Sequence, residues 1–375
     1  MKIKLLLHVS GEIGTKGKNR IFFERKLAEN IRRKIEKVKI KRAFGSFLLE
    51  IEKKDKAKLK QIPGIAWIAE AIEIEKDLKV IKEKVLDYAK TKKFKNFDIE
   101  VKRQDKSIAK TSQEIRQELI KFLIANGFKF KPKSRKIFIE LNKDWWLIYS
   151  KKEKCLDGLP TSTSGRVIAL VSGGIDSSVA SFLAMKKGLE IIFVHFHNYP
   201  SNNYKVIDDK IIRLIKKLNN YQIKSKVYII SFVKAQQEII KKIKPEYRML
   251  VYRWLMLKIA STIARKEKAL ALITGDSLGQ VASQTLSNLT ALLKQIEMPV
   301  LMPLLSFNKN EIIEIAKKIG TYEISIMPYA DCCSFMIAKH PATKINEGLL
   351  KKLVKKISKK VLNETLKEIR IEIIK

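Results

Sequence analysis

Residues 167–178, VIALVSGGIDSS, constrain the fold of this chain more than any other stretch of its sequence. An apolar, β-branched run ends abruptly at Ser-Gly-Gly, and a helical pattern of apolar residues follows. The pattern predicts a buried strand that leads directly into the N-terminus of a helix. Gly173 and Gly174 let the backbone turn tightly and direct its N–H groups toward an anion. No Lys follows the glycines, which excludes the G-x-x-x-x-G-K-[ST] loop of kinases and GTPases.

Asp176 lies at the start of that predicted helix and decides which anion the loop suits. A carboxylate beside a phosphate is repelled unless a divalent cation lies between them. The loop is therefore predicted to bind a metal-bound pyrophosphate, with hydroxyl donors from Ser172, Ser177 and Ser178. The SGG-x-DS pattern after a strand resembles the PP-loop of ATP pyrophosphatases, which cleave ATP between the α- and β-phosphates and adenylate a substrate oxygen. The alternative is a strand–helix turn that binds no ligand.

Charge narrows the class of substrate. The chain has 77 Lys plus Arg against 39 Asp plus Glu, a formal net charge of +38 over 375 residues. Together with a nucleotide loop, this excess favours a polyphosphate partner such as RNA. The alternative is a lysine-rich background with solvated helical faces, of which residues 351–360 are an example. Three cysteines and the lack of a signal peptide or membrane-spanning run predict a cytoplasmic protein with reduced thiols.

The sequence before the loop predicts two smaller domains. Residues 1–75 follow the β-α-β-β-α-β order of a ferredoxin-like domain, with strands near 3–9, 39–43, 47–52 and 66–74 and helices near 20–36 and 54–61. Gly11, Gly14 and Gly17 between the first strand and helix fit a phosphate-binding loop or a solvated turn equally well.

Residues 76–153 form the second predicted unit, with helices near 78–90 and 112–126 and strands near 97–103, 136–141 and 145–149. Lys102, Arg103 and the run 129–136 give it positive charge. Trp145 and Trp146 point to opposite faces of their strand, so one is predicted in the core. The other is a packing residue or a platform for base stacking.

Residues 154–165 are rich in Gly, Pro, Ser and Thr and are predicted to be an interdomain linker. The third domain, residues 166–375, alternates strands near 167–171, 190–195, 226–231 and 270–274 with helices. This order predicts a doubly wound parallel sheet with a nucleotide at the carboxyl ends of its strands. A basic helix near 347–367 and a strand-like run at 369–374 end the chain. The whole is thus a multidomain protein of the α/β and α+β classes.

A second candidate site follows the strand near 270–274. Gly275 breaks the strand, and Asp276 and Ser277 are typical of helix starts. A helix from this point would place Gln280, Gln284 and Asn288 in one row of hydrogen-bonding amides, because positions i and i+4 share a face. Its place after a strand favours ligand binding, and a capped surface helix is the alternative.

Cys332 and Cys333 are the only adjacent thiols. A direct disulfide between neighbours is strained, so they are predicted to act separately as attacking and resolving groups. The positive charge of Lys339, His340 and Lys344 would lower the pKa of a nearby thiol. Two adjacent cysteines fit a metal site poorly, and the remaining alternative is a pair of buried core cysteines. Cys155, in the predicted linker, receives no role.

The motifs together resemble the tRNA 4-thiouridine synthetase family (tRNA uracil 4-sulfurtransferase), which installs sulfur at uridine 8 of tRNA. The resemblance spans nearly the whole chain, in the family's order: GEIGTKGKNR, GLPTSTSG, VSGGIDSS, VHFHNYP, YRMLVYRWLM, ITGDSLGQVASQT, and GTYEISIMPYADCCS followed by KHPATK. It implies a ferredoxin-like domain, a THUMP RNA-binding domain and a PP-loop domain. It also implies a homodimer, ATP and Mg²⁺ as cofactors, and the acceptor arm of tRNA as partner.

Residue roles follow from the resemblance position by position. It implies that the pyrophosphate and its magnesium are held by Ser172, Gly173, Gly174, Asp176 and Ser177. It implies ATP contacts at Leu170, Val171, His195, Phe196, Arg253, Gly275 and Gln284. Cys333 matches the family's catalytic thiol, with Cys332 as a partner beside it.

Two departures from the family pattern bear on the sulfur source. The 42 residues after Cys333 leave no room for the rhodanese domain of longer bacterial members. The sulfur donor is therefore expected to be a cysteine desulfurase, another persulfide protein or free sulfide. No C-x-x-C pair is present, so an iron–sulfur cluster is not expected. The alternatives are another PP-loop enzyme of the 2-thiouridine or lysidine type, and a THUMP RNA-binding protein that has lost catalysis.

Overall fold

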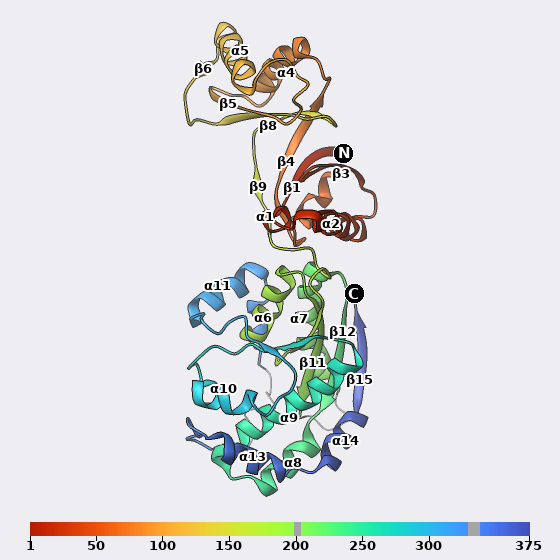
Figure 1. The fold of residues 1–375 in the computed structure, drawn as a ribbon, viewed down its shortest axis with the longest axis vertical. Coiled ribbons are helices and arrows are strands. Elements are labelled where there is room, and N and C mark those ends of the chain that lie inside the picture. The colour runs from red at the N-terminus through yellow and green to blue at the C-terminus, as the bar shows by residue number, and fades with distance from the viewer. Residues whose placement is uncertain (199–203, 329–337) are drawn as a thin grey trace. The chain divides into compact units, whose positions relative to one another are not determined.

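The computed structural model describes residues 1–198, 204–328 and 338–375. Its residues fall into two units, Met1–Gly158 and Leu159–Lys375, each with its own sheet (Figure 1). No helix within the described residues is both long and apolar enough to span a membrane.

One continuous sheet runs through the N-terminal unit in the order β2-β3-β1-β4-β8-β7-β5-β6. Its strands are β1 (Lys2–Val9), β2 (Lys39–Ala43), β3 (Ser46–Glu52), β4 (Ile65–Ile74), β5 (Asn96–Arg103), β6 (Lys129–Phe130), β7 (Lys136–Leu141) and β8 (Trp146–Tyr149), with β9 (Glu153–Lys154) beside β4. The strand β4 joins the two halves, because it pairs with β1 through residues 65–70 and with β8 through residues 71–74.

Helices flank each half of this sheet. They are α1 (Gly11–Gly14), α2 (Arg20–Lys34) and α3 (Lys56–Leu59) in the first half, and α4 (Leu78–Thr91) and α5 (Ser112–Ala125) in the second. The strand and helix order confirms the ferredoxin-like prediction. The predicted helix at 54–61 is shorter, with a 3-10 turn (Lys53–Asp55) before α3. The glycine-containing first loop contains α1, whose cap is the Ser10 hydroxyl.

Trp145 and Trp146 are both buried, at 1% and 4% exposure. Trp146 packs in the core beneath α4 and α5 with Val85 and Leu119, whereas Trp145 packs with Leu6 in a separate cluster. The two rings therefore lie on opposite faces of the sheet, as alternation along a strand requires. Packing accounts for both, and neither ring is exposed enough to be a stacking platform.

The C-terminal unit has a sheet whose described strands run β14-β13-β10-β11-β12-β15. They are β10 (Arg166–Leu170), β11 (Glu190–His197), β12 (Ser225–Ser231), β13 (Ala271–Ile273), β14 (Val300–Leu301) and β15 (Ile369–Ile374). All pair in parallel except β15, which is antiparallel to β12. The chain proceeds from β10 to β11 and β12 on one side, then crosses to β13 on the other. The carboxyl ends of β10 and β13 thus form a topological switch point, where such sheets bind ligands.

Helices cover both faces of this sheet (Figure 1). One layer contains α6 (Ile175–Lys186), α7 (Tyr204–Gln222), α11 (Lys309–Ile319) and α12 (Tyr322–Ser325). The other contains α8 (Val233–Lys242), α9 (Pro245–Lys266), α10 (Leu286–Leu293), α13 (Glu347–Lys355) and α14 (Lys359–Lys367). The predicted helix at 347–367 is therefore two helices, because Ser358 caps a new N-terminus by accepting from the N–H of Val361.

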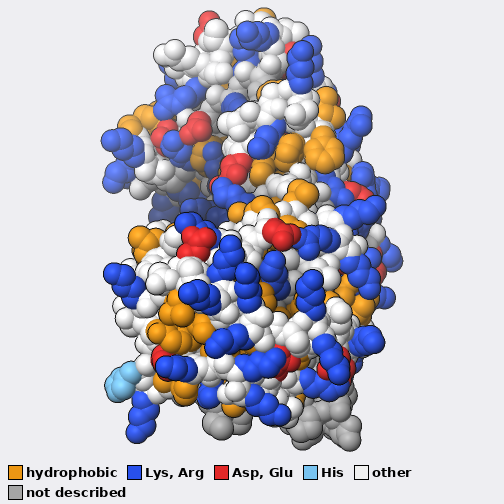
Figure 2. Space-filling view, turned by 60° about the horizontal axis from the view of Figure 1, so that its bottom comes forward, with side chains coloured by type: hydrophobic (Ala, Val, Ile, Leu, Met, Phe, Trp, Pro, Cys, Tyr) orange, Lys and Arg blue, Asp and Glu red, His pale blue; other side chains and the backbone are white. Residues whose placement is uncertain are grey.

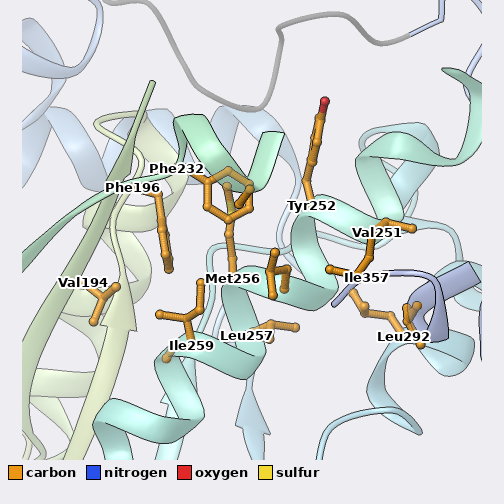
Figure 3. Close-up of a cluster of buried hydrophobic side chains, with 14 of the residues drawn as sticks. Val194, Phe196, Phe232, Val251, Tyr252, Met256, Leu257, Ile259, Leu292 and Ile357 are labelled. Carbon is orange, nitrogen blue, oxygen red and sulfur yellow. The ribbon is translucent and has the colours of Figure 1, made fainter. Parts of the chain in front are cut away.

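The main core of this unit lies between the sheet and α9. Figure 3 shows Met256 and Ile259 of α9 on the side of the helix that faces Phe196 and Val194 of β11, and Leu257 on another side. These five side chains are at most 6% exposed, and α9 carries apolar residues on most of its circumference. A helix buried on most sides holds its position firmly, and α9 also supplies one of the charged side chains of the site described next.

Candidate functional site

The loop after β10 forms the tight turn that the sequence predicts. Gly173 has a φ of +89°, a conformation that glycine adopts without strain. The loop is braced from within: the N–H of Ser172 donates to the Ser177 hydroxyl at 3.3 Å, and the N–H of Gly174 donates to the Ser172 hydroxyl at 3.3 Å. The first residues of α6 follow at once, so that their unpaired N–H groups are available to an anion.

Gly275, directly after β13, lies against this loop. A β-carbon built at Gly275 would lie 2.7 Å from the backbone nitrogen of Ser177 and 2.8 Å from the carbonyl carbon of Asp176. Both neighbours are backbone atoms, which cannot swing aside as a side chain can. The end of β13 and the first turn of α6 therefore approach this closely only with glycine at position 275.

Asp176 lies at the rim of the site, with its side chain 23% exposed. One carboxylate oxygen accepts from the Lys309 ammonium at 2.6 Å, and the other accepts from the Gln280 side-chain amide at 2.9 Å. The residue is thus held by two donors on its open side. Lys309, at the N-terminus of α11, brings positive charge to the predicted phosphate position and was not among the predicted site residues.

Arg253 of α9 meets a second carboxylate, that of Asp276. The guanidinium donates to Asp276 Oδ2 at 2.6 Å and to the carbonyl oxygen of Ser283 at 2.7 Å. The Thr274 hydroxyl and the Gln284 amide also donate to Asp276, at 2.8 and 3.0 Å. Asp276 is only 5% exposed, so its charge is compensated by three partners rather than by water. This network fixes the orientation of Arg253 and Gln284.

These elements enclose a pocket of about 290 Å³ at the switch point between β10 and β13. Of the predicted nucleotide contacts, it is lined by Leu170, Val171, Ser172, Asp176, Ser177, Phe196, Arg253, Gly275 and Gln284. Apolar side chains form one wall and the loop forms the other, an arrangement that suits a base and its phosphates. Further lining residues lie outside the predicted set of nucleotide contacts: Val194, Met249, Met256, Leu257, Val281 and Ser283. Asp276, which the sequence predicts as a helix start, also lines the pocket.

His195 does not line this pocket. The ring is 1% exposed, and its Nδ1 lies 2.7 Å from the carbonyl oxygen of Val171. Burial lowers the pKa of His195 to about 4, so the ring is neutral at neutral pH. In the described structure its contact is with the strand end that begins the loop. Gly173 and Gly174 likewise shape the turn rather than line the pocket.

The predicted helix beginning at Asp276 is wrong. The chain from 275 to 281 is irregular, a 3-10 turn covers Ala282–Gln284, and α10 begins only at Leu286. Gln280, Gln284 and Asn288 therefore do not share a helical face. Instead Gln280 contacts Asp176, Gln284 contacts Asp276, and Asn288 donates to the carbonyl oxygens of Ala282 and Ala342. The close packing of Gly275 on the loop explains why an extended turn replaces the helix here.

Cys332 and Cys333 lie outside the described residues, which stop at 328 and resume at 338. Cys155, the described free cysteine, is partly buried, and burial raises its pKa to about 12. Such a thiol is unreactive at neutral pH. No group of three or more His, Cys, Asp or Glu within the described ranges is placed to hold a metal ion by itself.

Comparisons with known sequences identify two parts of the chain. Residues 162–360 match the family described as "Thiamine biosynthesis protein (ThiI)", and residues 4–69 match the "ThiI ferredoxin-like domain". A probable tRNA sulfurtransferase of Thermoanaerobacter sp. (strain X514) is 36% identical over 349 residues, covering 91% of this chain and 92% of that protein. One from Caldanaerobacter subterraneus subsp. tengcongensis is 38% identical with the same coverage.

Among solved structures, a 4-thiouridine synthetase in complex with RNA and bound ATP is similar over the full length of both chains. The TM-score is 0.89 and the sequence identity is 33%. The protein PH1313 from Pyrococcus horikoshii is similar over 85% of this chain and all of its own, with a TM-score of 0.62 and 25% identity.

Proposed function

The chain belongs to the ThiI family and is an ATP-dependent tRNA sulfurtransferase, and we propose that it makes 4-thiouridine at uridine 8 by adenylating uracil O4 and then replacing that oxygen with sulfur. The observation that carries this proposal is the pocket at the switch point. There the phosphate-binding loop, Asp176 and Arg253 converge on one space of nucleotide size.

ATP lies in this pocket with its base against the apolar wall of Phe196, Met256 and Leu257. Its phosphates face the loop, where Ser172, Ser177 and the first N–H groups of α6 donate hydrogen bonds. Arg253 provides a fixed positive charge, because its partner Asp276 holds it in place. These donors are in position before the reaction begins, and such preorganisation lowers the barrier where charge develops on the departing pyrophosphate.

Magnesium fits the residues present. The ion commonly takes one or two carboxylates and completes its shell with phosphate oxygens and water. Asp276 is 5% exposed and is held by Arg253, Thr274 and Gln284. Asp176 lies at the rim near the phosphate position, and its two partners, Lys309 and Gln280, are exposed side chains that can move aside for a metal ion. Asp176 would therefore hold Mg²⁺, which when bound neutralises charge on the phosphates. Lys309 beside it is a second cation for the same region.

The two chemical steps exchange one atom. Uracil O4 attacks the α-phosphorus, the bond to the bridging oxygen breaks, and pyrophosphate leaves. Sulfur then attacks C4, and AMP departs with the original oxygen. The sulfur arrives as free sulfide or as a persulfide on Cys333. In the second case the outer sulfur of the persulfide bonds to C4, and the Cys332 thiolate then attacks the Cys333 sulfur and breaks its bond to the uracil sulfur. The strained Cys332–Cys333 disulfide that forms is reduced by an external thiol before the next turnover. A cysteine desulfurase or another persulfide protein is the proposed donor.

The N-terminal unit is proposed to bind the acceptor arm of tRNA through phosphate contacts, with a homodimer in the cytoplasm as the working form. Figure 2 shows lysine and arginine side chains spread over the visible face rather than gathered in one patch. A dispersed positive surface suits sequence-independent contacts with an RNA backbone, while specificity comes from the shape of the folded RNA.

Asp176→Ala tests the adenylation step. We expect the variant to bind tRNA but to lose the pyrophosphate release that depends on both ATP and tRNA. Asp209→Ala is the matched control, because Asp209 is an exposed carboxylate on α7 that pairs across one helical turn with Arg213. Full turnover in Asp176→Ala would contradict the role of this carboxylate.

Nucleoside mass spectrometry of treated tRNA tests the product. We expect 4-thiouridine at position 8, and, with a persulfide protein as the sulfur donor, we expect Cys333→Ala to accumulate adenylated tRNA without it. A 2-thiouridine or lysidine product would identify a different PP-loop enzyme. An absence of AMP formation by the wild-type protein would instead favour an RNA-binding protein without catalysis.

A further inference from the structure

Lys210 on α7 is a buried lysine behind the phosphate-binding loop. Its exposure is 7%, and the neighbouring Ile211 and Leu214 are completely buried. A charged ammonium in such surroundings is unfavourable unless hydrogen bonds compensate for the lost water. The position therefore calls for an explanation beyond helix packing.

The ammonium group donates to two backbone carbonyl oxygens, that of Ser325 at 2.8 Å and that of Met327 at 2.7 Å. Ser325 is the last residue of α12, and Met327 follows it in the next turn. The charge of Lys210 is thus directed at the backbone of residues 325–327. Lys210 is not among the described residues that line the nucleotide pocket.

The stem of the same side chain lies against the loop. A β-carbon built at Gly173 would lie 3.7 Å from Cε and 3.8 Å from Cδ of Lys210. One side chain therefore lies beside the turn that is proposed to bind phosphate and, through its ammonium, donates to the chain segment at 325–327. The hydroxyl of Ser178 on α6 adds a second connection, because it donates to the Thr321 hydroxyl at 3.4 Å.

Residues 325–327, which the Lys210 ammonium contacts, lie shortly before the cysteine pair in the sequence. Met327 precedes Cys332 by five residues and Cys333 by six. We propose that Lys210 is a positioning residue, which fixes the chain entering the cysteine pair directly behind the phosphate-binding loop. This inference rests on the function proposed above, since it assigns to Lys210 the placement of the sulfur-transfer step relative to bound nucleotide.

A positioning role for Lys210 predicts different effects on the two half-reactions, adenylation and sulfur transfer. The ATP pocket has its own supports in Gly275 and the network of Arg253 and Asp276, so adenylation should not depend on Lys210. Sulfur transfer should depend on it, because an error of about 1 Å in placing a reacting group can lower a rate by about 100-fold. A residue needed only for stability would affect both steps alike.

Lys210→Met removes the charge and keeps the length of the side chain. We expect tRNA-dependent pyrophosphate release close to the wild-type rate, and formation of 4-thiouridine, with a cysteine desulfurase and free cysteine as the sulfur source, lowered by about 100-fold. Lys210→Arg, which can still donate to both carbonyls, should recover part of the thiolation. Lys216→Met is the matched control, because Lys216 is exposed on the same helix. Thermal unfolding shows which variants are folded. If Lys210→Met does not fold, the milder substitution Lys210→Gln takes its place in the assays.

Four results would overturn the proposal. Wild-type thiolation by Lys210→Met would show that the contact is dispensable. Equal losses of pyrophosphate release and thiolation, or unfolding of both the Met and Gln variants, would assign Lys210 to stability alone. A wild-type protein that forms no 4-thiouridine would instead refute the proposed function, and the role of Lys210 with it.

Discussion

At Gly275, two backbone segments pass so closely that the residue type follows from the distance alone. We expect Gly275→Ala to push β13 away from the loop and to lower the rate of pyrophosphate release by about 10- to 100-fold, since small displacements of reacting groups have large kinetic effects. Steady-state kinetics with ATP and tRNA measures the loss.

Gly348→Ala is the control for this substitution. Gly348 is helical, and the nearest atom to an added β-carbon is the Asn346 side-chain oxygen at 3.6 Å, an ordinary contact. Alanine also favours a helix over glycine. Unchanged pyrophosphate release in Gly275→Ala would mean that the end of β13 can move away from the first turn of α6 without loss of activity.

His195 links the stability of the C-terminal unit to pH. Its pKa is lowered to about 4 by burial, whereas an unfolded chain has a histidine pKa of about 6.5. The unfolded state therefore binds a proton first as pH falls. The stabilising contribution, about 3 kcal/mol, is fully present above pH ~6.5 and is lost as pH falls toward ~4.

Urea unfolding at several pH values between about 4 and 7 checks this expectation. His195→Gln should reduce the slope of unfolding free energy against pH in that window, although it also lowers stability by weakening the contact with Val171. Replacing the exposed His340 by Gln should leave the slope unchanged. An identical slope in His195→Gln would show that other groups cause the pH dependence.

At the scale of elements, the strands and long helices were predictable because each has a clear hydrophobic period. The region after β13 was not. Asp276 and Ser277 are residue types that commonly begin a helix. Two tertiary contacts outweigh this preference: the close packing of Gly275 against the first turn of α6, and the ion pair between Arg253 and Asp276. Local preference is weak beside tertiary contacts of this kind. The break between α13 and α14 could have been found from Ser358, a good N-cap residue within a lysine-rich run.

The last strand, β15, is a small element with a large expected effect. It covers one edge of β12, and its Ile374 carbonyl oxygen accepts from the Asn219 amide at 2.8 Å. Deleting residues 369–375 would expose the edge of a hydrophobic sheet. We expect the Tm of the C-terminal unit to fall by about 5 °C or more and aggregation to increase. Differential scanning calorimetry provides the measurement.

Removal of Lys375 alone is the control, because that residue lies beyond the strand. A truncated protein with the wild-type Tm would show that β12 is stable as an edge strand. It would also separate the stability of this sheet from the packing of α14, which precedes β15.

For the molecule as a whole, the net charge of +38 makes a prediction about RNA affinity. If binding neutralises roughly 6 phosphates, the affinity for tRNA should fall by about three orders of magnitude between roughly 50 and 200 mM salt. Titrations at a series of salt concentrations measure the slope. A flat response would mean that the lysine excess is a background of composition and does not contact RNA.

The sequence by itself determined the order of the main strands, the phosphate-binding turn and the ATP-dependent chemistry that the turn supports. These depend on local patterns, such as a strand that ends at Ser-Gly-Gly before Asp176. Only the tertiary structure decided which distant residues meet there. Arg253 reaches Asp276, Lys309 reaches Asp176, and Lys210, beside Gly173, reaches the backbone of residues 325–327. Such contacts depend on how helices pack on the sheet, which no short stretch of sequence specifies.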